Sequence, residues 1–241
     1  MYPDKSKLSI ADNQHLLIVN EADLIFTTGK FENLQTTPLQ TKQIIDNEEL
    51  HGVKANDVAT VLKMKHAFDF MINNTQKLSF NDIKQINLLI QGVETPSAGQ
   101  LRQRDVVVPL TNEVWTPPKP NEATEKQWFQ QLITQQSISA TEKAINLMLH
   151  LSRQQYFENG NKRTALFAAN NLLLTHGAGM LAIPENKMHW YQSKLQKFDR
   201  TNNDRDIKPW LYDNCIFSYA PAKTVYPKAE SKQADDPEQP I

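Results

Sequence analysis

The sequence has almost no cysteine: among its 241 residues only Cys215 carries a thiol. A single thiol excludes an intramolecular disulfide, which fits a protein of a reducing compartment. No window approaches 18 apolar residues, and the N-terminus lacks a basic stretch followed by an apolar run. We therefore expect no secretory signal, no membrane span and no membrane partner, and predict a cytoplasmic protein.

The sequence also lacks an excess of charge of one sign. Lys and Arg total 26 and Asp and Glu total 27, so the formal net charge is −1. General nucleic-acid binders show a basic excess or a basic stripe. We therefore expect no nucleic-acid partner. The length suffices for one well-packed domain with appendages.

What the sequence does contain is helical periodicity. Apolar residues recur three and four positions apart in the ranges 58–72, 83–90, 144–151 and 166–173, and Gly177 after the last range suits a helix C-terminus. From about Pro221 onward Pro, Lys, Glu, Asp and Gln dominate, a composition that buries little apolar area. We predict a mostly α fold that ends near residue 218, with a mobile C-terminal tail over 219–241.

The one strand signal runs from Asp105 to Trp115, with a turn over 110–113 and prolines at 117 and 118 that stop any continuation. Its strand-forming residues are β-branched or aromatic: Val106, Val107, Val108, Val114 and Trp115. A short hairpin in a helical protein suggests a lid over a site. A plain connector remains an equal alternative.

The densest polar motif is Gln-Tyr-Phe-Glu-Asn-Gly-Asn-Lys-Arg over 155–163. We predict a helix that ends near Gln155, a tight loop containing Gly160, and a second helix that begins around Lys162. Free N–H groups and the helix dipole favour an anion at such an N-terminus, whereas Lys162 and Arg163 placed there destabilise the helix alone. The pattern therefore indicates a phosphate site. The alternative is that Asn159 caps the helix and both cations are solvated or paired elsewhere.

This motif resembles the Fic/Doc signature H-x-F-x-[DE]-[GA]-N-[GK]-R. Five of the seven signature positions match, read at Gln155, Phe157, Asn159, Gly160, Asn161, Lys162 and Arg163. Residues 98–102 and the hairpin that follows are similar to the family's target-binding flap. The resemblance covers about residues 20–218 and implies a Fic-type helical bundle with a short β-hairpin flap. It divides the chain into an N-terminal segment 1–20, a Fic domain 21–218 and the tail.

The resemblance implies roles for particular residues. Asn161, Lys162 and Arg163 would hold the phosphates of ATP or another nucleoside triphosphate, together with Asn159 and backbone N–H groups around Gly160. The hairpin would align a protein target by strand addition. The implied reaction is transfer of AMP, or of phosphate as in Doc, to a Ser, Thr or Tyr hydroxyl. A homodimer is left open.

Two departures from the signature bear on catalysis. Gln155 stands where the family has the histidine that accepts the hydroxyl proton, and an amide holds no proton near neutral pH. Loss of a positioned general base costs on the order of 10²–10⁴ in rate. Asn159 replaces the acidic Mg²⁺ ligand, so we expect weakened Mg²⁺ binding and assign no metal-ligand set. Impaired or repurposed catalysis follows, with a non-enzymatic, flap-using binding module or a toxin–antitoxin-like regulator as the alternative.

A second short motif lies upstream. Thr28, Glu32 and Asn33 match [ST]-x-x-x-E-[GN], which resembles the inhibitory motif of Fic proteins that carry an N-terminal inhibitory helix. In that subclass the glutamate pairs with a second arginine, and Leu166 stands at that position here. We therefore expect Glu32 to use Arg163 or Lys162, competing with phosphate for the same donors. The alternative is that Glu32 and Asn33 only end a surface helix.

Overall fold

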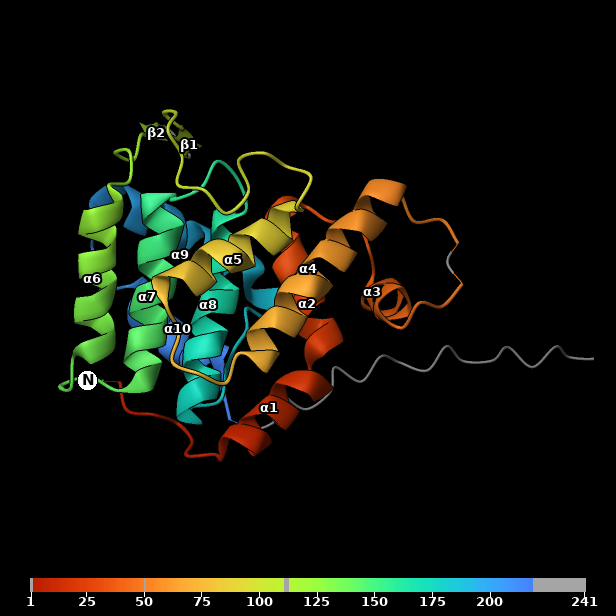
Figure 1. Ribbon diagram of the computed structural model, residues 1–241, viewed down its shortest axis with the longest axis horizontal. Helices are drawn as coiled ribbons and strands as arrows, with labels where there is room; N and C mark the ends of the chain where they lie inside the picture. Colours follow the sequence, from red (N-terminus) through yellow and green to blue (C-terminus); the bar gives the residue numbers. More distant parts are fainter. Residues whose placement is uncertain (1, 50, 111–112, 219–241) are drawn as a thin grey trace, which may run out of the picture.

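The computed structural model describes residues 2–49, 51–110 and 113–218, which form a bundle of α-helices (Figure 1). The predicted mostly α fold class is confirmed. The helices in chain order are α1 Ile10–Val19, α2 Glu21–Gly29, η1 Lys30–Glu32, α3 Pro38–Ile45, α4 Ala55–Asn73, α5 Phe80–Gln91, α6 Glu122–Thr134, α7 Ala140–Gln154, α8 Asn161–His176, η2 Glu185–Lys187, α9 Met188–Thr201 and α10 Ile207–Cys215.

Helix α8 lies at the centre of the bundle. Every residue from Arg163 to Leu174 is buried, because α7, α5, α4 and α1 pack around it. A helix that is apolar on almost all sides is stable only inside a core. Gly177 ends it in the left-handed conformation (φ 62°), as predicted for this position. The core thus fixes the N-terminus of α8, where the polar loop lies.

Helix α1 shares this core. Leu17 is fully buried, and the Asn13 side chain donates to the Gly179 carbonyl (3.0 Å) and accepts from the Gly179 N–H (2.7 Å). The predicted boundary at residue 20 therefore falls between two packed helices, α1 and α2. The predicted tail, 219–241, lies outside the described residues.

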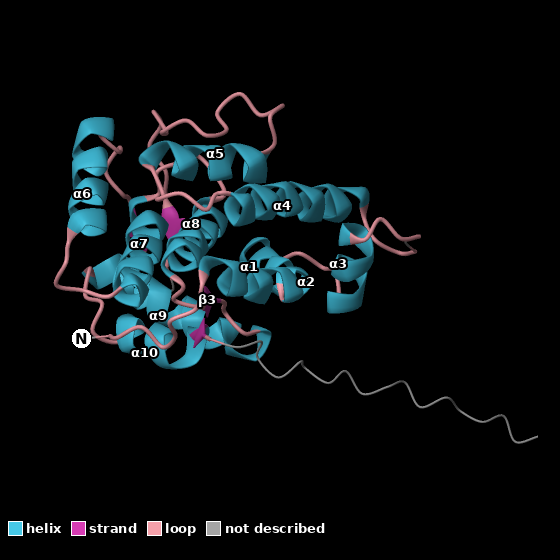
Figure 2. Cartoon of the chain, turned by 60° about the horizontal axis from the view of Figure 1, so that its bottom comes forward, coloured by secondary structure: helices cyan, strands magenta, loops and turns pink. Residues whose placement is uncertain are grey.

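Two small antiparallel sheets accompany the helices. Strand β1 (Val108–Pro109) pairs with β2 (Val114–Trp115), in the register Val108 to Trp115. This hairpin projects beyond the helices in Figure 1. It is shorter than the sequence predicted, because Val106 and Val107 lie outside the pairs of the β-ladder. The second sheet pairs β3 (Met180–Leu181, labelled in Figure 2) with β4 (Ile216–Phe217). This second sheet was not predicted from the sequence. Two-residue strands show no periodicity to detect.

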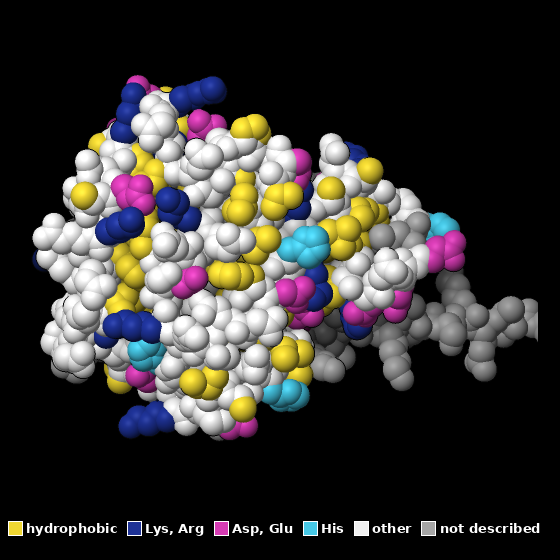
Figure 3. Space-filling view, in the orientation of Figure 1, with side chains coloured by type: hydrophobic (Ala, Val, Ile, Leu, Met, Phe, Trp, Pro, Cys, Tyr) yellow, Lys and Arg dark blue, Asp and Glu magenta, His cyan; other side chains and the backbone are white. Residues whose placement is uncertain are grey.

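The surface carries both signs of charge. On the face drawn in Figure 3, Lys and Arg side chains lie among Asp and Glu side chains and form no continuous stripe. Of the helices that the structure describes, none combines the length and the apolar character needed to cross a membrane.

Candidate functional site at the N-terminus of α8

The loop between α7 and α8 is built on two left-handed residues. Gln155 follows α7 with φ 50° and ψ 61°, and Gly160 precedes α8 with φ 74°. The positive φ favours glycine at residue 160, and a Cβ there would lie 2.4 Å from the Gln91 side-chain nitrogen and force that side chain to move. The predicted helix–loop–helix is confirmed.

The Asn161 side chain holds the loop closed. Its oxygen accepts from the Phe157 N–H (2.9 Å), and its nitrogen donates to the Phe157 carbonyl (2.8 Å) and to Gln155 Oε1 (2.9 Å). Both amide hydrogens are used, so in this arrangement only the backbone N–H of Asn161 is available to a phosphate. From the sequence, Asn161 was predicted to belong to the phosphate site, and nothing in the sequence indicated this structural role.

Gln155 is also engaged at both ends of its amide. Besides accepting from Asn161, it donates from Nε2 to the Ser152 carbonyl at 2.5 Å. The side chain therefore supports the loop, and an amide offers no basic atom at this position.

Among the described residues, no group caps the first backbone N–H groups of α8. Gly160 is the N-cap and makes no side-chain capping bond, and the first helical bond runs from the Thr164 N–H to the Gly160 carbonyl (2.9 Å). The Asn159 side chain instead accepts from the Gly160 N–H (2.7 Å), so the alternative of an Asn159 cap is not what the structure shows. The N–H groups of 161–163 therefore face the loop with the positive end of the helix dipole.

The two cations of the motif have different surroundings. Arg163 is 5% exposed, with Nη2 3.3 Å from Glu32 Oε1 and with Nε lacking a partner in the part of the chain that is described. Burial lowers the pKa of Arg163, against the opposing effect of the Glu32 carboxylate. Lys162 is half-buried, and its charge acts on the buried Asp199 carboxyl.

A cavity of about 210 Å³ lies directly at this helix terminus. Three segments that are distant in sequence meet there: η1, the flap and the loop. The lining residues are Phe31, Glu32, Val107, Val108, Pro109, Gln155, Glu158, Asn159, Gly160, Asn161 and Lys162. The structure thus brings Glu32, part of the flap and four of the predicted phosphate-binding residues, Asn159 to Lys162, to one cavity. Arg163 does not line it and reaches it only through its contact with Glu32.

Residues 77–173 match the sequence model of the Fic/DOC family. This segment, 77–173, is therefore assigned as a Fic/DOC domain. Among solved structures, a Fic-domain-containing signalling protein from Bacteroides thetaiotaomicron is similar at 20% identity and a TM-score of 0.70, covering 85% of this chain and 84% of that one. Fic-1 from C. elegans is similar at 17% identity and a TM-score of 0.69, covering 85% of this chain and 67% of that one. A Fic family protein from Desulfovibrio desulfuricans is similar at 14% identity and a TM-score of 0.69, covering 85% of this chain and 66% of that one. At these identities the likeness concerns the fold. No curated protein matches the chain.

The other residues of the upstream motif lie outside the cavity of the Fic/DOC domain. The Thr28 hydroxyl is buried and donates to the Leu24 carbonyl one helical turn earlier (2.5 Å). Asn33 ends η1 in the left-handed conformation (φ 55°). Both residues shape the helix end that presents Glu32, and neither lines the cavity.

Some of the predicted flap residues line the cavity and others do not. Val107 and Val108 line the cavity, whereas Val106, Val114 and Trp115 do not. Val107 and Val114 are 58% and 61% exposed and offer apolar surface on the hairpin. The Trp115 ring instead packs on the Arg153 guanidinium, at 4.1 Å from its centroid, and anchors the hairpin to α7.

The fit of a divalent metal depends on the carboxylates at the loop. Glu158 lines the cavity beside Asn159, with Arg104 at 3.8 Å. Among the described residues there is no group of three His, Cys, Asp or Glu side chains able to hold a metal. Mg²⁺ binds through one or two carboxylates together with phosphates, so it fits here only as a companion of a bound nucleotide.

Two buried polar residues of the Fic/DOC domain were missed from the sequence. Asn87 of α5 donates to the Asn159 carbonyl (3.0 Å) and to the Thr164 hydroxyl (3.1 Å), and it accepts from the Gly99 N–H (3.0 Å). It thereby joins the loop, α8 and the segment before the flap. In the sequence, the position of Asn87 inside the apolar helical repeat of 83–90 is the one sign of this role. Arg102, the second residue, contacts the loop and both ends of the flap.

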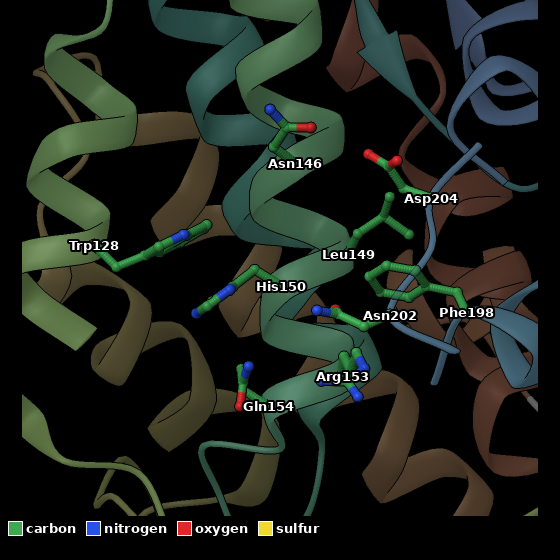
Figure 4. A pocket seen from close by; sticks show the side chains of 9 residues that line it. All are labelled: Trp128, Asn146, Leu149, His150, Arg153, Gln154, Phe198, Asn202 and Asp204. Carbon is green, nitrogen blue, oxygen red and sulfur yellow. The ribbon is translucent and has the colours of Figure 1, made fainter. Parts of the chain in front are cut away.

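A second cavity lies beside α7 and shares no lining residue with the first (Figure 4). It has a volume of about 250 Å³, and His150 lies on its wall, stacked on Trp128 with ring centroids 3.4 Å apart. His150 and the Tyr156 hydroxyl both bond to Glu125. Burial raises the pKa of Glu125, but these two bonds outweigh it and hold the pKa below its usual range. The cluster attaches the loop residue Tyr156 to α6.

Proposed function

We propose that this Fic/DOC domain binds a nucleoside triphosphate at the N-terminus of α8 and is related to protein adenylyl- or phosphotransferases, with weak or absent turnover. The observation that carries the proposal is the uncapped N-terminus of α8, beside Lys162 and the buried Arg163. Burial of a cation is costly unless an anion compensates it. Glu32 supplies one carboxylate, and phosphate oxygens suit the same donors.

The reaction that such a site would perform is a single displacement at phosphorus. For AMP transfer, the target hydroxyl oxygen attacks the α-phosphorus and pyrophosphate leaves. For phosphate transfer, it attacks the γ-phosphorus and the nucleoside diphosphate leaves. In either case the hydroxyl proton must go to a base. Gln155 does not supply one, which supports slow turnover.

Nucleotide binding is tested by thermal stabilisation of the full chain with ATP and Mg²⁺. Ligand binding to the folded state raises the free energy of unfolding, so Tm should rise with ATP concentration. We expect Lys162→Ala to lose this rise. Lys194→Ala is the matched control, because Lys194 is equally half-buried but lines a different cavity on α9. Absence of any shift with all common nucleotides would refute the proposal.

A non-enzymatic binding module is the second candidate. Gln155 is tied into the loop by both ends of its amide, and the hairpin leaves Val107 and Val114 exposed. Both features suit a protein that holds a partner strand without modifying it. Partner binding that is insensitive to nucleotide, in a chain with no ATP-dependent Tm shift, would favour this candidate.

A further inference from the structure

Arg102 is a buried cation, and in the described part of the chain all hydrogen bonds of its guanidinium go to main-chain carbonyl oxygens. The residue is 2% exposed, and among the described residues no carboxylate forms an ion pair with it. Its guanidinium donates to four carbonyls, those of Gln155 (2.6 Å), Arg104 (2.8 Å), Pro117 (3.0 Å) and Pro118 (2.6 Å). Its backbone N–H donates to the carbonyl of Tyr156 (2.9 Å).

The four carbonyls that Arg102 binds belong to separate segments of the chain. Arg104 lies where the chain enters the flap, and Pro117 and Pro118 lie where it leaves. Gln155 and Tyr156 belong to the loop between α7 and α8. One planar fork of N–H donors therefore joins three segments, and four of its five hydrogens are used.

The other attachments of the flap are few: Trp115 packs on the Arg153 guanidinium and donates from Nε1 to the Arg153 carbonyl (3.4 Å), and Glu113 lies 3.8 Å from Arg200. The flap's strands are two residues long each, and an isolated short hairpin is marginally stable in water. At the surface, Lys119 and Asp105 also link the flap's two ends, at 3.6 Å, but both side chains are more than half exposed. Exposed ion pairs contribute little, whereas buried hydrogen bonds to a charged donor contribute more.

We infer that Arg102 is a positioning residue that clamps the flap to the loop and sets the distance between a flap-bound segment and residue 155. The clamp itself stands on the geometry, and its consequence for transfer rests on the proposed function. A guanidinium is required because an ammonium has three donors and no planar fork. Loss of the fork leaves main-chain carbonyls at both ends of the flap without a donor.

The clamp is tested by hydrogen–deuterium exchange of the full chain, without any ligand. In Arg102→Met, amides of 104–108, 110, 113–116 and 155–157 should exchange at least about tenfold faster, the change expected for loss of about 1.4 kcal/mol of local stability. Exchange in α4 and α8 should stay as in the unmodified chain. Lys119→Met is the matched control, because it removes the surface link between the same two ends, and it should leave the flap protected.

Arg102→Lys keeps the charge and covers the case in which Arg102→Met does not fold. It should retain the overall Tm within a few degrees and still exchange several-fold faster at the flap. Flap exchange unchanged in a folded Arg102 variant would overturn the inference.

A functional readout separates positioning from general stability. In a chain that binds ATP, Arg102→Lys should leave the ATP-induced Tm shift intact and lower transfer to a protein target. A chain that binds no nucleotide would refute the proposed function and leave the exchange result standing. An Arg102→Lys variant that loses nucleotide binding and flap protection alike would contradict a specific positioning role.

Discussion

The Glu32–Arg163 pair leads to our most specific prediction, because it should affect stability and ligand binding in opposite directions. The perturbation is Glu32→Gln, which removes the charge and keeps the volume. At 3.3 Å, Coulomb's law with an effective dielectric constant of 20 gives an attraction of about 5 kcal/mol before desolvation. The Glu32 side chain is 36% exposed, so water screens much of this and the net value falls to about 1–2 kcal/mol.

From that value both effects follow. For a chain of this length, about 1–2 kcal/mol lowers the Tm of the unliganded protein by about 3–6 °C. The same change frees Arg163 for phosphate, so ATP should bind about tenfold more tightly. Scanning fluorimetry over an ATP series measures both quantities on the same samples.

Glu185→Gln is the control for this experiment. Glu185 pairs with Lys30 of η1 at 3.8 Å and is 59% exposed, so its loss removes a carboxylate near the same helix without touching Arg163. We expect its Tm and ATP response to match the unmodified chain. A Glu32→Gln protein with a lower Tm but an unchanged or smaller ATP shift would refute competition between the carboxylate and phosphate.

Three further predictions concern the loop and the core beneath it. Gln155→His combined with Asn159→Asp should raise transfer of label from ATP to protein, by on the order of 10²-fold or more, and no rise would mean that the site lost more than two side chains. Gly160→Ala should lower Tm more than Gly52→Ala does. Both glycines have φ near 70°, but of the two only Gly160 has other atoms within 4 Å of an added Cβ. Equal losses of Tm would show that backbone strain alone matters. Burial raises the pKa of Asp199 to about 7, so the folded state keeps a proton that the unfolded state releases above about pH 4. The free energy of unfolding should therefore fall as the pH rises from 4 to 7. Asp199→Asn should flatten the dependence of Tm on pH over that range.

The helix–loop–helix could be predicted from the sequence because its signals are local. Apolar spacing predicted α7 and α8, and Gly160 marked the tight turn between them. The clustering of Lys162 and Arg163 at a helix N-terminus indicated an anion site for an electrostatic reason that does not depend on the rest of the fold. In the structure one of these cations is buried and the other lines the cavity.

The strands were predicted less well. The β-branched run from Val106 indicated a longer hairpin than the two-residue strands that form, because strand propensity depends on a paired neighbour. The sheet of β3 and β4 joins residues 180–181 to 216–217, and no local pattern in either segment reports a partner that far away.

By itself, the sequence determined the helices α4, α5, α7 and α8, where the polar loop lies, and that Gln155 cannot act as a base, since each depends on side-chain chemistry or on neighbours within a few residues. Glu32 was expected to use Arg163 or Lys162, and only the tertiary structure decided that it pairs with Arg163. Only the tertiary structure also decided that the Asn161 amide bonds within the loop and that Arg102 binds both ends of the flap. Those contacts link residues from separate elements. Their partners are chosen by how the helices pack around α8, and that packing is a property of the whole chain.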